Sequence, residues 1–138
     1  MGLNIELLQE SFAALAPQGQ RLADTFYGHL FHDYPQVKPM FENTSMAEQK
    51  NKLLATLKLA VDNLRRPDIL VPALEQLGAR HVDYGTLPDH YPAVGATLLK
   101  SLAEVAGELW SDELEQAWAD VYGVVAEHML AGAAAPVT

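Results

Sequence analysis

The sequence predicts an all-α protein. Apolar residues recur every three or four positions along almost the whole chain, and no segment shows the two-residue alternation of a half-buried strand. Prolines and glycines interrupt this pattern at intervals of helix length. The 138 residues are 49% hydrophobic, and neither an internal repeat nor a low-complexity linker divides them. We therefore expect one domain over residues 1–138.

The first three expected elements precede residue 45. Asn4 is a candidate N-cap for the first apolar stripe, which ends, or gives way to the next helix, at Pro17. A second stripe crosses residues 22–31. Pro35 and Pro39 then bracket a short irregular corner that carries Phe41, followed by a polar loop.

Two helices are expected in the middle of the chain. The first carries a stripe over residues 53–64, with Gln49 one turn before it, and Pro67 closes it. The second places Leu70, Leu74, Leu77 and His81 on one apolar face and stops near Gly85.

Two longer helices are expected at the C-terminal end. One spans residues 91–105 and ends at Gly107, and the last begins after Ser111 as a candidate N-cap. The short connection predicts an antiparallel hairpin. The small residues of segment 131–138 are expected to fray. Counting the short corner, the sequence predicts about seven helices.

Charge and composition restrict the partners. The net charge of −9 disfavours nucleic acid and anionic lipid. The absence of cysteine excludes disulfides, thiolate metal ligands, iron–sulfur clusters and a cysteine nucleophile. The N-terminal segment lacks a signal-peptide pattern, and no apolar run is long enough to span a bilayer, so we expect a cytoplasmic protein without a membrane partner.

His81 is the first candidate for chemistry. A lone histidine on an apolar face is usually a core residue with a local hydrogen bond. Neutral imidazole is also a good axial ligand for iron, provided its second nitrogen finds an acceptor. In a helix the carbonyl of Leu77, one turn earlier, can be that acceptor. The pair His29 and His32 is a weaker metal candidate, because no further ligand is close in sequence.

Two polar residues lie on otherwise apolar faces. Tyr27 and Gln49 each have an ordinary explanation, a core tyrosine and a polar residue at a helix start. A phenol and an amide can also donate hydrogen bonds to a bound, partly negative oxygen in a dry pocket. Phe41 is either a plug under a loop or a ring packed on a planar group. Four aliphatic residues are either general core or pocket wall, namely Leu53, Leu57, Val94 and Leu98.

Taken together, these segments resemble a known family. FYGHLFHDYPQVKPMF, AEQKNKLLATL, LGARHVDYG with HYPAVG, and AWADVYGVVAEHM are similar, in this order, to bacterial single-domain globins and the haem domain of flavohaemoglobins. The resemblance covers essentially the whole chain. It implies a globin fold, a three-over-three helical sandwich around a buried haem b. Without cysteine, that haem must be bound non-covalently.

The resemblance also implies roles for particular residues. His81 matches the axial iron ligand, while Tyr27, Gln49 and Leu53 match distal positions around a bound gas. Tyr91 matches the tyrosine beside the axial histidine, and Arg80 is as consistent with a haem propionate contact as with an exposed helix position. The implied haem-binding set is Phe41, Leu53, Leu57, Leu77, Arg80, His81, Tyr91, Val94 and Leu98.

The sequence departs from flavohaemoglobins in two respects. Their flavin- and nicotinamide-binding reductase domain has no counterpart before Thr138, so we expect no internal electron donor. Their glutamate near the end of the last helix, bonded to the axial histidine, is replaced by an alanine around Ala133. A charged acceptor strengthens an imidazole ligand, so its loss predicts an ordinary globin-like proximal bond and weak peroxide chemistry.

Three functions remain open from the sequence. The leading one is high-affinity binding of oxygen, carbon monoxide and nitric oxide, by a monomer or weak homodimer. The alternative is a nitric oxide dioxygenase that uses a separate reductase, with Tyr27, Gln49 and Tyr91 as catalytic candidates. The third is a haem-free helical sensor or interaction domain, which would not need polar groups at Tyr27 and Gln49.

Overall fold

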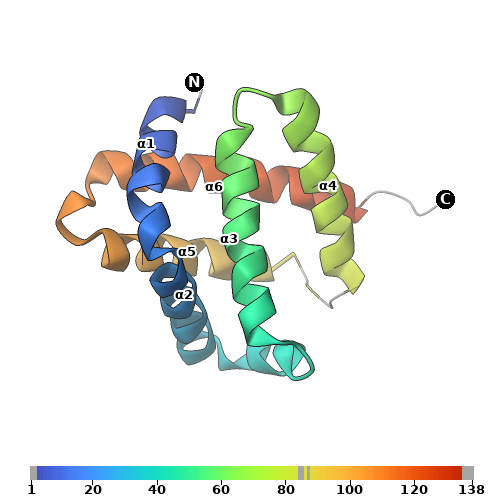
Figure 1. The fold of residues 1–138 in the computed structure, drawn as a ribbon. Helices are drawn as coiled ribbons and strands as arrows, with labels where there is room; N and C mark the ends of the chain where they lie inside the picture. The colour runs from blue at the N-terminus through green and yellow to red at the C-terminus, as the bar shows by residue number, and fades with distance from the viewer. Residues whose placement is uncertain (1–2, 84–85, 87, 135–138) are drawn as a thin grey trace.

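A computed structural model describes residues 3–83, 86 and 88–134, and within these residues the chain is helical and contains no strand (Figure 1). The all-α prediction is confirmed. The described α-helices are α1 (Ile5–Leu15), α2 (Gly19–Asp33), α3 (Met46–Asp62), α4 (Pro67–Asp83), α5 (His90–Ala106) and α6 (Asp112–Ala134). Three short 3-10 helices join some of them, η1 (Ala16–Gln18), η2 (Pro35–Phe41) and η3 (Gly107–Leu109).

Side-chain caps begin several of these helices. The Asn4 side chain accepts a hydrogen bond from the Leu7 amide at 3.3 Å, as predicted. Ser45 caps α3 through the Glu48 amide at 3.4 Å, and Ser111 caps α6 through the Leu114 amide at 3.1 Å. Gly107 follows α5 with φ of 57°, a conformation that glycine adopts without a Cβ penalty.

Two expected boundaries, and the irregular form expected for the corner, differ from the structure. Pro67 does not close α3, which ends at Asp62; it is the first residue of α4, where a proline loses no helical hydrogen bond. The corner at 35–41 is a 3-10 helix. Helix α6 continues through residues 131–134 of the expected frayed segment, whereas 135–138 lie outside the described residues.

The helices form two crossing layers. Helices α1, α3 and α4 stand in front of α5 and α6, which run antiparallel across the back (Figure 1). Helix α2 packs on α5, α4 packs most extensively on α6, and α1 packs on both α3 and α6. This is the three-over-three arrangement expected from the resemblance, and the predicted C-terminal hairpin is part of it.

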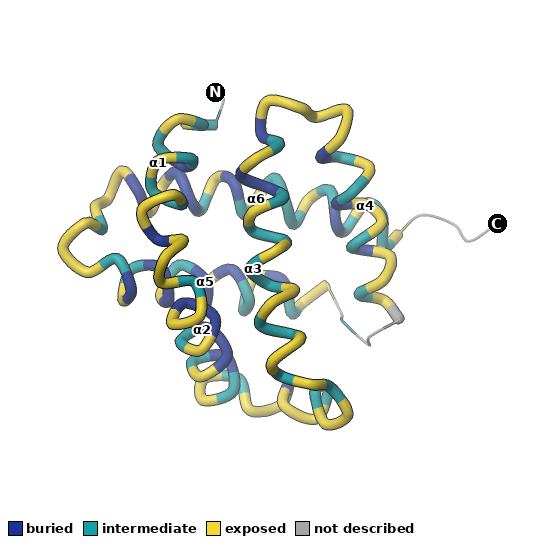
Figure 2. The backbone as a smooth tube through the Cα atoms, in the orientation of Figure 1, coloured by how far each residue is buried: buried dark blue, intermediate teal, exposed yellow. Residues whose placement is uncertain are grey.

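The buried residues lie where these layers face each other, and the outer helix faces are exposed (Figure 2). Trp118 of α6 is 1% exposed, and its indole nitrogen donates to the Ser11 hydroxyl of α1 at 3.1 Å. The buried hydroxyls of Thr97 and Ser101 donate to carbonyls one turn earlier in α5. The interior polar groups named here are therefore satisfied, as close packing requires.

Within the described ranges, none of the helices combines the length and the apolarity that crossing a membrane requires.

Candidate functional site

The chain path brings the start of α3 and the end of α4 to the same end of the molecule. The two helices run antiparallel and are joined by the short turn over residues 63–66 (Figure 1). Helix α3 packs on α1 and α2, whereas α4 packs on α6, so these two consecutive helices contact different parts of the fold. Gln49 and Leu53 near the start of α3 therefore share this end with Leu77 and His81 near the end of α4.

His81 has a defined proton position. Its Nδ1 lies 2.7 Å from the carbonyl oxygen of Leu77, one helical turn earlier. A carbonyl can only accept a hydrogen bond, so Nδ1 must carry the proton and the lone pair of the neutral ring is on Nε2. This is the second-nitrogen contact that the sequence predicted. It leaves the half-buried imidazole in the tautomer that a metal ligand requires.

Tyr27 and Gln49 contact each other directly. Gln49 Nε2 donates to the Tyr27 hydroxyl oxygen at 3.1 Å, and Tyr27 is only 5% exposed. Because that oxygen accepts the amide hydrogen, the phenolic hydrogen points to a different acceptor. Burial raises the pKa of Tyr27, and the hydrogen bond from Gln49 offsets this in part. The phenol therefore remains a protonated donor at neutral pH.

Aromatic rings surround Tyr27. Phe26 meets the Tyr27 ring edge-on at a centroid distance of 4.9 Å, and Phe41 does so at 5.8 Å. Phe31 lies 5.9 Å from Tyr27 and 5.3 Å from Phe41, closing the cluster. The 3-10 helix η2 thus holds Phe41 against α2, next to the predicted distal pair. The sequence places Phe31 on the apolar stripe over residues 22–31, and its spacing of four residues from Tyr27 is the signal that the two rings share a face.

The remaining apolar candidates lie on three helices. Leu53 and Leu57 of α3, Leu77 of α4 and Val94 of α5 pack against the core but stay partly exposed. Leu98 of α5 is 4% exposed and belongs to the core. Arg80 on α4 is exposed.

Tyr91 is buried with an unpartnered hydroxyl. The residue is 7% exposed, and its hydroxyl oxygen has no hydrogen-bond partner among the residues that the structure describes. Its backbone carbonyl accepts from the Tyr122 hydroxyl at 2.7 Å. Burial raises the pKa of both phenols, and the nearby Tyr91 raises that of Tyr122 further.

The sequence motif AWADVYGVVAEHM contains Tyr122 but does not by itself indicate a role for its hydroxyl. A Cβ on Gly95 of α5 would lie 2.6 Å from the Tyr122 ring, so this glycine makes room for it. A glycine inside an apolar helical stripe was the signal for such a close approach.

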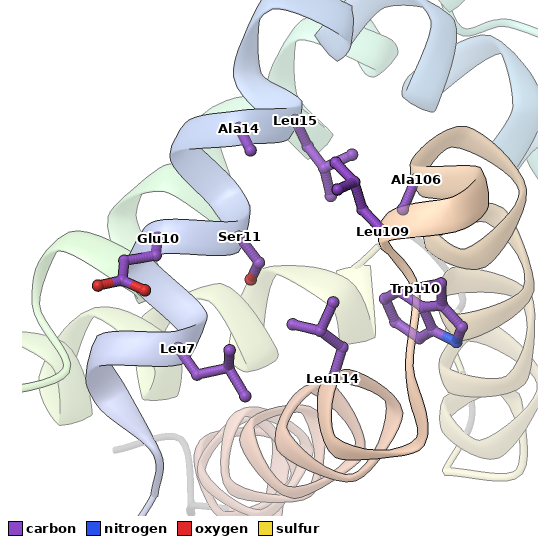
Figure 3. A pocket seen from close by; sticks show the side chains of 9 residues that line it. All are labelled: Leu7, Glu10, Ser11, Ala14, Leu15, Ala106, Leu109, Trp110 and Leu114. Carbon is purple, nitrogen blue, oxygen red and sulfur yellow. The ribbon is translucent and has the colours of Figure 1, made fainter.

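Other features lie away from these residues. A half-open apolar hollow of about 210 Å³ lies between α1, the end of α5 with η3, and the start of α6 (Figure 3). A second hollow of about 230 Å³ lies between the end of α1, the start of α2 and α3. His29 pairs with Glu104 and His32 with Asp33, and the described residues contain no cluster of three potential metal ligands.

Comparison with known proteins agrees with the fold. The Globin family model matches residues 24–129. The flavohemoprotein of Chromobacterium violaceum is 33% identical over 126 residues, and that of Bacillus subtilis is 30% identical over 125 residues. These alignments cover 90% and 89% of this chain but 31% of each relative. The chain thus spans about a third of the length of these relatives.

Two solved structures share the fold. A bacterial globin from Campylobacter jejuni superposes with a TM-score of 0.82 at 28% identity, covering 94% of this chain and 93% of that one. An engineered carbene transferase, derived from a putative nitric oxide dioxygenase of Rhodothermus marinus, gives 0.85 at 27% identity, with coverages of 94% and 90%. The chain therefore belongs to the globin family, whose fold binds diatomic gases at haem.

Proposed function

We propose that this globin binds oxygen with high affinity, and also carbon monoxide and nitric oxide, at a non-covalent haem b. In this proposal His81 would hold the haem iron, and Tyr27 and Gln49 would donate hydrogen bonds toward the gas. The observation that carries the proposal is the hydrogen bond from Gln49 to the Tyr27 hydroxyl. It directs a buried phenolic hydrogen away from the amide, where a bound gas can accept it.

The residues fit a haem. Partly exposed aliphatic side chains on three helices offer apolar contact for a flat macrocycle. The tautomer of His81 presents the Nε2 lone pair that iron requires. Tyr91 adds a buried hydroxyl with no partner among the described residues; such a group costs roughly 1–3 kcal/mol when unsatisfied, and a further polar neighbour would stabilise it.

Each residue has a separate task. The haem supplies the iron centre at which a diatomic gas is held. The Leu77 carbonyl holds the Nδ1 hydrogen of His81 and so orients the ring. Gln49 orients the hydroxyl of Tyr27, which donates its hydrogen toward the gas. The neighbouring phenylalanine rings exclude water and thereby strengthen that hydrogen bond.

The walls of the site complete the proposal. Arg80 is exposed and free to approach a propionate at the surface. Leu53 follows Gln49 by one turn and would limit the space beside the gas. The apolar contacts to the macrocycle would come from Phe41, Leu53, Leu57, Leu77, Val94 and Leu98.

Replacement of the distal phenol tests the proposal. A hydrogen bond to a partly charged group contributes about 1.5–3 kcal/mol, so Tyr27→Phe should speed oxygen dissociation roughly tenfold to hundredfold. Stopped-flow displacement of oxygen by carbon monoxide measures this rate. Tyr34→Phe is the matched control, because Tyr34 is half-buried directly after α2. It should leave the rate of oxygen dissociation unchanged. An unaltered rate in Tyr27→Phe would remove this residue from the distal side.

A second candidate function is nitric oxide dioxygenation, in which oxygen, nitric oxide and one electron combine to give nitrate. Similarity to flavohemoproteins and to a structure derived from a putative nitric oxide dioxygenase favours it. In this reaction Tyr27 and Gln49 would hold the bound oxygen, and Tyr91 would support the proximal side. Repeated turnover requires electrons from a reductase partner.

Sustained nitric oxide consumption distinguishes the two functions. Haem-loaded protein in air, supplied with NADH and a broad-specificity flavin reductase, should consume many equivalents of nitric oxide per haem if it is a dioxygenase. His81→Ala should abolish that activity. A single stoichiometric burst would favour gas binding alone.

A further inference from the structure

Helices α4 and α6 cross with their backbones in direct contact. A Cβ built on Gly78 of α4 would overlap the carbonyl oxygen of Met129 in α6. In the reverse direction, a Cβ on Gly132 of α6 would overlap the carbonyl oxygen of Glu75 in α4. Both obstacles are backbone atoms, which cannot rotate away as a side chain would. The two glycines thus permit a separation that no other residue type would allow.

Not all helical glycines in the chain have this role. Gly28 of α2 and Gly123 of α6 would place a Cβ in open space. A glycine inside a helix costs roughly 0.5–1 kcal/mol relative to alanine. At Gly78 and Gly132 this cost is offset by the close crossing, since α4 packs more extensively on α6 than on any other element.

The crossing coincides with the segment that positions His81. Gly78 directly follows Leu77, whose carbonyl accepts the Nδ1 hydrogen of the imidazole, and precedes His81 by less than one turn. A displacement of α4 at Gly78 would therefore move both the ring and its acceptor. Close-packed interiors transmit such displacements, because little free volume absorbs them.

We infer that Gly78 and Gly132 are positioning residues for the axial histidine. The α4–α6 crossing holds the His81 segment against α6 independently of the haem, and so sets the height and direction of the imidazole. This inference rests on the proposed function, in which His81 is the iron ligand.

Alanine variants of the full, haem-loaded chain test the inference. In Gly78→Ala and Gly132→Ala, the iron–histidine stretching band of the reduced, gas-free protein should shift or broaden. Haem loss to an acceptor apoglobin should become about tenfold to hundredfold faster, the range that overpacking of this severity produces. Gly123→Ala, on α6 like Gly132, and Gly28→Ala on α2 are matched controls. They should change neither the iron–histidine band nor the rate of haem loss. A folded Gly78→Ala protein with an unshifted band would overturn the inference.

If the alanine variants fail to fold, hydrogen exchange of the unmodified protein still tests the inference. If the crossing holds α4 without haem, amides over residues 75–81 should stay protected from hydrogen exchange after haem is removed. Loss of their protection while α5 stays protected would show that the haem positions the helix, contrary to the inference.

These results remain distinct from failure of the proposed function. An unmodified protein with no iron–histidine band, or an unchanged band in His81→Ala, would reject His81 as the ligand. The exchange experiment would still report on the crossing itself.

Discussion

At the scale of single residues, a single hydrogen-bonding neighbour fixes the position of the polar hydrogen on His81 and on Tyr27. The Leu77 carbonyl selects the Nδ1-protonated form of His81, and the Gln49 amide turns the Tyr27 hydrogen away from itself. Neither neighbour is charged. The resemblance to flavohaemoglobins implies that their glutamate corresponds to a position around Ala133, which is half-buried on α6 one residue after Gly132.

The proximal bond is therefore expected to be that of an ordinary globin. Its iron–histidine stretching frequency, measured by resonance Raman spectroscopy, should lie below the range of peroxidases. In Ala133→Glu the frequency should rise, because a carboxylate acceptor makes the imidazole a stronger donor to iron. The haem reduction potential should fall in the same variant, and potentiometry measures it.

The matched control is Ala134→Glu, which adds the same charge one residue further along on an exposed position. It should leave both the band and the potential unchanged. A peroxidase-like frequency in the unmodified protein would contradict the expectation, as would equal effects of the two glutamates.

At the scale of helices, side chains do not completely fill the space between α1 and the corner formed by η3 and the start of α6. The hollow there is lined by Leu7, Ser11 and Ala14 on one side and by Trp110 and Leu114 on the other (Figure 3). It lies at the opposite side of the fold from the end of α4, so its packing should affect stability without affecting gas binding.

Ala14→Leu should fill part of this hollow and stabilise the protein by about 0.5–2 kcal/mol, as cavity-filling changes commonly do. Leucine is also a good helix former, so the substitution should not destabilise α1 itself. Urea unfolding of the haem-loaded protein measures the gain, with the oxygen dissociation rate measured alongside. Ala13→Leu adds the same side chain at the preceding position, which does not line the hollow, and should give no comparable gain. A destabilised Ala14→Leu protein would mean that the hollow cannot accept the larger side chain.

At the scale of the whole molecule, buried phenols predict the response to alkaline pH. Burial raises the pKa of Tyr27, Tyr91 and Tyr122 above the ordinary value of 10.0. Above that pH the unfolded chain loses phenolic protons that the folded chain retains. The free energy of unfolding should then fall with rising pH, by up to about 1.4 kcal/mol per pH unit for each tyrosine.

Urea unfolding at a series of pH values from neutral to above pH 10 checks this. Stability attributable to these phenols should be fully present below the unfolded pKa and lost above it. Tyr122→Phe should lower stability at neutral pH by about 0.5–1.5 kcal/mol, because its hydrogen bond to the Tyr91 carbonyl is lost. The same variant should flatten the alkaline slope by one tyrosine. An unchanged slope would show that Tyr122 ionises equally in both states.

Most of the secondary structure could be predicted from the sequence, because its causes are local. The spacing of apolar residues determines which face of a helix is buried, and Asn4 and Ser111 cap helices through amides three residues away. The Leu77–His81 hydrogen bond was predictable for the same reason, since one helical turn separates its partners. Pro67 was misassigned because a proline is compatible both with the end of one helix and with the first turn of the next.

The helical class, the order of the helices and the residue types available for chemistry all follow from local patterns along the chain. Which of these residues contact each other depends on the packing of the folded helices. Gln49 contacts Tyr27 across 22 positions, and Tyr122 bonds the Tyr91 carbonyl across 31. The backbone contact of Gly78 with Met129 likewise joins helices that α5 separates in the chain. Such contacts depend on how helix faces pack in three dimensions, and periodicity along the chain carries no information about which faces will meet.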